Sequence, residues 1–94
     1  MPSSVQLWEF VLRVLKNPLY NNILSWENQH DGIFHIHDPQ ALAELWGKHR
    51  NHEGMNYDKM SRAMRYYYRR GILEPVRERL TYKFALRLRP MFFD

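Results

Sequence analysis

The chain has 94 residues, no cysteine and a net charge of +4, and 45% of its residues are hydrophobic. This length suits one domain with a single modest core, and the composition argues against disorder. The lack of cysteine excludes disulfides and thiolate metal sites, and we find neither a signal peptide nor an apolar run near the roughly 20 residues of a membrane span.

The first part of the chain predicts a helix followed by a β-hairpin. Over residues 3–18, apolar side chains recur at helical spacing, Ser3 and Gln6 have the spacing of a capping box, and an Asn-Pro pair ends the pattern. Residues 22–28 and 32–38 alternate apolar and polar side chains, as strands do. An Asp-Gly pair between these two segments indicates a hairpin turn.

The rest of the chain predicts two helices and then two strands. Asp38 is a good N-cap and Pro39 suits the first helical position, while the polar residues 48–54 are expected to form the loop after this helix. A third helix should begin after Asn56 and end near Arg70, because a glycine follows. The segments ILEPV and RLTYKFAL then have the pattern of strands, the first with a proline that suits an edge strand.

This order, α-β-β-α-α-β-β, predicts an α+β winged helix-turn-helix, with three helices packed on a small four-stranded antiparallel sheet and the last hairpin as the wing. We expect residues 5–85 to form the domain, with flanking segments at 1–4 and 86–94. The second flank, LRLRPMFFD, could pack on the sheet, contact another chain or be a frayed end.

The positive charge is concentrated in the middle of the chain. Residues 46–73 contain seven Lys and Arg against two Asp and Glu, whereas residues 1–45 contain two against five. Such a localised basic region is typical of proteins that bind a polyanion, although a solvated surface would explain it about as well.

The predicted third helix has one side for a core and one for a partner. Tyr57, Met60, Met64 and Tyr67 recur at helical spacing and should face the core. The tyrosine triplet cannot all face one way, so we assign packing to Tyr67. The opposite side carries a cationic and aromatic set: Lys59, Arg62, Arg65, Tyr66 and Arg69.

Two arginines on this helix have the spacing needed to recognise neighbouring bases. Arg62 and Arg65 are three positions apart, so their guanidinium groups project side by side. Asp58 could pair with Arg62, whereas Arg65 has no carboxylate three or four positions away. An α-helix fits the DNA major groove, and a guanidinium fork can bind O6 and N7 of guanine together.

Neither a metal site nor a catalytic site is indicated. The pairs His35/His37 and His49/His52 lack a third ligand at suitable spacing, and without cysteine we expect no metal site. The carboxylates are scattered, and no set of nucleophile, base and orienting group is evident. We therefore expect no cofactor and no enzymatic activity.

Four segments resemble the ETS domain of eukaryotic transcription factors, and together they span about residues 5–84. The segments are QLWEFVLRVL, FHIHDPQALAELWGKHRN, MNYDKMSRAMRYYYRRGIL and RLTYKF. The resemblance implies a winged helix-turn-helix in a nuclear transcription regulator. It also implies monomeric, sequence-specific binding to double-stranded DNA through a GGA core, with possible protein partners for the flanking segments.

The resemblance also implies roles for individual residues. Arg62 and Arg65 match the arginines that bind the core guanines, and Tyr66 matches a neighbouring base contact. The matched phosphate contacts are the backbone N–H of Leu7 and the side chains of Trp46, Arg50, Tyr57, Lys59, Arg70 and Arg79.

The chain departs from the family pattern at the wing and in the helix-turn-helix loop. The wing turn lacks a glycine and is about one residue shorter, with Pro75 where a basic residue is common and Leu80 where an aromatic hydroxyl often contacts phosphate. His52 and Gly54 stand where lysines are frequent. We expect weaker phosphate contacts as a result. The alternatives are a winged helix that binds nucleic acid nonspecifically or one that binds an acidic protein.

Overall fold

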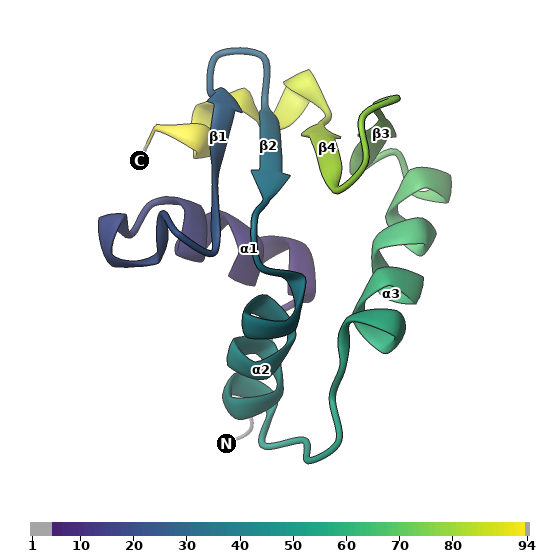
Figure 1. The fold of residues 1–94 in the computed structure, drawn as a ribbon. Helices are drawn as coiled ribbons and strands as arrows, with labels where there is room; N and C mark the ends of the chain where they lie inside the picture. The colour runs from purple at the N-terminus through teal and green to yellow at the C-terminus, as the bar shows by residue number, and fades with distance from the viewer. Residues whose placement is uncertain (1–4, 94) are drawn as a thin grey trace.

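The computed structural model describes residues 5–93 and confirms the α+β winged helix-turn-helix (Figure 1). Two short 3-10 helices, η1 and η2, are added to the expected order. The elements are α1 (Leu7–Leu15), η1 (Pro18–Tyr20), β1 (Leu24–Asn28), β2 (Ile33–Ile36), α2 (Pro39–Arg50), α3 (Tyr57–Arg69), β3 (Leu73–Pro75), β4 (Thr81–Phe84) and η2 (Leu86–Phe92).

The four strands form one antiparallel sheet in the order β1-β2-β4-β3. Because β3 lies at an edge, Pro75 occupies a position where a missing backbone N–H is tolerated, as its sequence predicted. Glu74 lies opposite Lys83, and their charged groups are 3.9 Å apart. The hairpin β3–β4, the wing, thus lies next to the end of α3 (Figure 1).

Side-chain caps begin the two helices of the helix-turn-helix. The Asp38 carboxylate accepts a 3.0 Å hydrogen bond from the Ala41 N–H, and the Asn56 side-chain oxygen accepts one of 2.9 Å from the Lys59 N–H. Each bond satisfies one of the backbone donors that a helix start leaves without a partner. Gly71 follows α3 with a φ of +66°, a conformation that favours glycine. The predicted starts of α2 and α3 are confirmed.

Two sequence-based boundaries were wrong. The N-cap of α1 is Gln6, whose N–H donates to a Glu9 carboxylate oxygen at 3.1 Å, whereas the expected cap Ser3 lies outside the described residues. The loop predicted over residues 48–54 begins three residues later in the structure, because α2 continues to Arg50. Asn51 ends the helix in the left-handed region at a φ of 53°, and cations in the last turn suit the helix dipole.

The segment after β4 packs into the core. Phe92 is fully buried, and its ring centre lies 5.2 Å from that of Trp26 and 5.8 Å from that of Phe84. Arg89 Nε donates a 2.8 Å hydrogen bond to the His30 carbonyl. Of the three possibilities for this tail, packing on the sheet is the one observed. The domain boundary between residues 85 and 86 stays a prediction.

The wing turns without a glycine by placing a leucine in the left-handed region. Leu80 has a φ of 58°. This conformation costs a residue with a Cβ roughly 1–2 kcal/mol. The Leu80 side chain packs against the core, and its carbonyl accepts a 2.8 Å hydrogen bond from the Ile36 N–H. Tertiary contacts therefore hold this turn in the absence of the usual glycine.

Candidate nucleic-acid interface

Helix α3 has a buried side and an open side. Met60 and Met64 are each 1% exposed, and Tyr67 is 7% exposed. The expected cationic set is exposed, with the exposed fraction of the Arg62 side chain at 69% and that of Tyr66 at 50%. The helix lies at one edge of the molecule, so a large ligand can reach its open side (Figure 1).

The three residues expected to contact bases lie together. Arg62, Arg65 and Tyr66 line one hollow of about 490 Å³ on α3, together with Tyr68 and Arg69. Arg69 was expected on this side of the helix without an assigned contact, whereas Tyr68 was absent from the expected set.

The charges of this hollow are only partly balanced within the protein. Arg62 Nη2 lies 3.3 Å from an Asp58 carboxylate oxygen, which confirms the predicted pair. Within residues 5–93, Arg65 has no carboxylate within 4.0 Å. The exposed Arg62–Asp58 pair contributes little stability and can open at low cost. A cationic surface of this kind can bind an external anion.

Three of the expected phosphate contacts line a second hollow, of about 420 Å³, where the start of α1 and the end of α2 meet α3. They are Leu7, Trp46 and Arg50, and Tyr67 of α3 lies beside them. Trp46 is only 8% exposed, and the Arg50 guanidinium carbon lies 5.6 Å from the centre of its ring. The positive end of the α1 dipole, an indole and a cation thus converge at one place, which suits an anion.

Tyr67 links α3 to the start of α1. The Trp8 N–H donates a 3.4 Å hydrogen bond to the Tyr67 hydroxyl. Burial raises the pKa of Tyr67, and the N–H groups of Trp8 and Leu7 oppose the rise. The sequence indicated the packing role of Tyr67. It held no signal for the hydrogen bond between the Trp8 N–H and the Tyr67 hydroxyl, because the two residues are 59 positions apart.

A second tyrosine contact joins α3 to the sheet. The hydroxyl groups of Tyr57 and Tyr82 are 2.8 Å apart. Burial raises the pKa of Tyr82, and the hydrogen bond to Tyr57 adds to the rise. The Tyr68 ring stacks on that of Tyr82 at 6.4 Å between centres. Tyr82 was not among the expected site residues, but it orients two residues of α3.

The remaining expected contacts lie outside both hollows. Lys59 Nζ donates a 3.2 Å hydrogen bond to the Gly54 carbonyl in the loop before α3, and Arg70 is hydrogen-bonded to Tyr66. Arg79 is exposed in the wing turn. These three expected contacts thus lie in the first turn of α3, at the end of α3 and in the wing turn.

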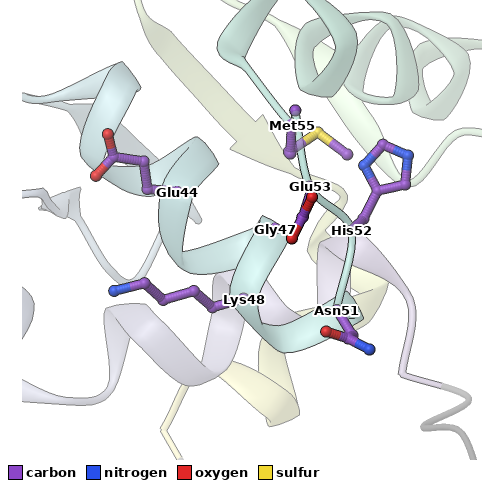
Figure 2. Close-up of a pocket in the computed structure, with 8 residues that line it drawn as sticks. Glu44, Gly47, Lys48, Asn51, His52, Glu53 and Met55 are labelled. Carbon is purple, nitrogen blue, oxygen red and sulfur yellow. The ribbon is translucent and has the colours of Figure 1, made fainter.

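A further pocket of about 300 Å³ lies at the end of α2 and the loop that follows. Figure 2 shows Glu44 and Lys48 of α2 on one side and His52, Glu53 and Met55 of the loop on the other. Over residues 5–93 there is no cluster of three or more potential metal ligands, and no helix there is long and apolar enough to cross a membrane. The mixed charge of this pocket indicates no particular ligand.

Residues 4–85 match the model of the Ets-domain family. The chain is 49% identical to an "ETS homologous factor" of Bos taurus over 86 residues, which cover 89% of this chain and 29% of that protein. It is 50% identical over 83 residues to "ETS-related transcription factor Elf-5" of Homo sapiens, covering 87% of this chain and 31% of that protein. The human "ETS-related transcription factor Elf-3" is 47% identical over 86 residues, or 89% of this chain and 23% of that protein. The chain therefore spans less than a third of the length of these relatives.

Proposed function

The chain belongs to the Ets-domain family, and from this premise we propose that it recognises a GGA core in double-stranded DNA through helix α3. We also propose that it does so as a monomer and as part of a nuclear transcription regulator. The observation that carries the proposal is the gathering of Arg62, Arg65 and Tyr66 in one exposed hollow. Protein partners would bind through the flanking segments.

The two arginines supply the base recognition. A guanidinium fork satisfies O6 and N7 of guanine at once, and each such pair discriminates against a wrong base by about 1–3 kcal/mol. Arg65 has no acidic partner in the described chain, so it enters the groove without breaking an ion pair. Arg62 exchanges its exposed bond to Asp58 for a base, at small cost because that pair is solvated.

Phosphate contacts orient the helix. Leu7, Trp46 and Arg50 line the second hollow beside the positive end of the α1 dipole, and we propose that the Leu7 N–H, the Trp46 indole N–H and the Arg50 guanidinium bind phosphate there. Outside that hollow, we propose phosphate contacts for Lys59 in the first turn of α3 and Arg79 in the wing.

Two tyrosines contribute to the proposed interface in different ways. If the Tyr82 hydroxyl donates to Tyr57, the Tyr57 hydroxyl keeps its own hydrogen for a phosphate oxygen. Tyr82 would then orient a phosphate contact without touching DNA. The guanidinium of Arg70, the remaining expected phosphate contact, is hydrogen-bonded to the Tyr66 hydroxyl.

Exchange of each arginine for lysine tests the proposal, because lysine keeps the charge and loses the fork. Arg62→Lys or Arg65→Lys should reduce the preference for a GGA duplex over a scrambled one by about 5- to 150-fold. Weak nonspecific binding should remain. Arg69→Lys is the matched control on the same helix and should keep the preference.

A mobility-shift assay at fixed salt with scrambled competitor measures this ratio. Equal affinity of the unmodified protein for matched and scrambled duplexes would instead support nonspecific nucleic-acid binding. No retention on either duplex at moderate salt would support an acidic protein partner. Survival of the ratio in both lysine variants would show that the two arginines do not read the core.

A further inference from the structure

Arg70 and Tyr66 form a pair at the end of α3. Arg70 Nη1 donates a 2.8 Å hydrogen bond to the Tyr66 phenol oxygen, and its guanidinium carbon lies 5.6 Å from the centre of the Tyr66 ring. The two residues are four positions apart, which places them on the same side of the helix. Tyr66 also shares its hollow with Arg62 and Arg65, so the pair borders the proposed base-reading group.

This hydrogen bond fixes which role the Tyr66 hydroxyl can play toward a ligand. A phenol can both donate and accept, whereas a guanidinium can only donate. Arg70 therefore occupies the phenol oxygen as an acceptor and leaves the hydroxyl hydrogen for an external acceptor. No other partner for this hydroxyl is present within residues 5–93.

We propose that Arg70 determines specificity through Tyr66, by setting the Tyr66 hydroxyl as a hydrogen-bond donor. At the exocyclic position of the major-groove edge, guanine O6 and thymine O4 accept hydrogen bonds, whereas adenine N6 and cytosine N4 donate them. The purine N7 accepts in both guanine and adenine, so the proposed contact is to the exocyclic group. At one position beside the GGA core, the protein then favours a keto base, guanine or thymine, over an amino base, adenine or cytosine. This inference rests on the proposed function, because it requires α3 to lie in the major groove.

The proposal gives Arg70 a different role from that of a phosphate contact. A phosphate contact strengthens binding to all sequences about equally and adds about 1 to the salt slope. A positioning residue instead changes the ratio between sequences. The two roles can therefore be separated by measuring flanking-base preference and salt dependence on the same variants.

The experiment uses duplexes with a fixed GGA core and three randomised base pairs on each side, selected by the 94-residue protein at fixed salt and then sequenced. The unmodified protein should enrich keto over amino bases at one position, by several-fold and up to about tenfold. Arg70→Ala and Tyr66→Phe should each bring that ratio close to one. The double variant should lower it no further, because the two side chains act as a unit.

Arg69→Ala is the matched control. It removes a cation at the adjacent exposed position, and Arg69 makes no hydrogen bond to Tyr66 within the described chain. It should weaken binding to all flanking sequences alike and keep the keto preference. All three positions are exposed, and melting curves should show each single variant to be folded.

Two results would overturn the role of Arg70. One is an Arg70→Ala variant that keeps the keto preference, whether its affinity falls uniformly or stays unchanged. The other is a Tyr66→Phe variant that keeps that preference. A duplex with a scrambled core, measured in parallel, distinguishes failure of the Arg70 role from failure of the proposed function. If the unmodified protein binds the scrambled duplex as well as the GGA duplex, the proposed function fails and the inference fails with it.

Discussion

Phe92→Ala is the substitution that most directly tests how far this fold extends. The Phe92 side chain is fully buried, and its ring packs against those of Trp26 and Phe84. The tail is also anchored there by Gln29 Nε2, which donates a 2.7 Å hydrogen bond to the Phe92 carbonyl. A buried Phe→Ala change costs about 3–5 kcal/mol, because apolar contacts are lost and a cavity remains.

A loss of this size is large for a small domain, whose free energy of unfolding is about 5–15 kcal/mol in total. With a fall of about 4–8 °C in Tm per kcal/mol, the variant should melt at least about 12 °C below the unmodified protein. Circular dichroism melts and urea titrations measure both quantities. DNA binding, measured well below both transitions, should be retained because Phe92 is not among the proposed contacts.

Phe93→Ala is the matched control. The substitution removes the same kind of side chain at the next residue, and Phe93 is 59% exposed. Its free energy of unfolding should change by no more than about 0.5 kcal/mol. If the two alanine variants melted together and close to the unmodified protein, the tail would not be packed in the core and the reasoning would be refuted.

Three further predictions concern single residues. His49→Phe should raise the free energy of unfolding by about 1 kcal/mol, because Nε2 of His49 is the buried side-chain atom without a hydrogen-bond partner in the described chain; a lower Tm would refute this. Burial raises the pKa of Tyr82, so the unfolded chain loses that proton first and stability should fall as pH rises above about 10. Tyr82→Phe should flatten this alkaline loss in urea titrations, and an unchanged pH profile would contradict it. Asp58→Asn should strengthen DNA binding up to about fivefold at low salt, because it releases Arg62 from a solvent-exposed ion pair. Titration of a labelled duplex measures the affinity, and no gain would contradict the prediction.

Local signals in the sequence were sufficient for most of the helix-turn-helix. Asp38 and Asn56 cap the helices they were expected to cap, because an N-cap acts over three residues. The two sides of α3 followed from helical spacing alone. The Arg62–Asp58 pair, four positions apart, was also correct. The pairing of Arg70 with Tyr66 has the same spacing and could have been found in this way.

Contacts between distant segments were decided only by the tertiary structure. The sequence left the tail open among three possibilities, since nothing near Phe92 in the chain shows which surface will cover it. The hydrogen bond from the Trp8 N–H of α1 to Tyr67 joins residues 59 positions apart, and the Tyr57–Tyr82 bond joins residues 25 positions apart. Periodicity and capping describe neighbours along the chain, whereas burial depends on which elements meet. The sequence by itself therefore determined the helices, the hairpins and the cationic side of α3, and the tertiary structure decided how that side is held and oriented.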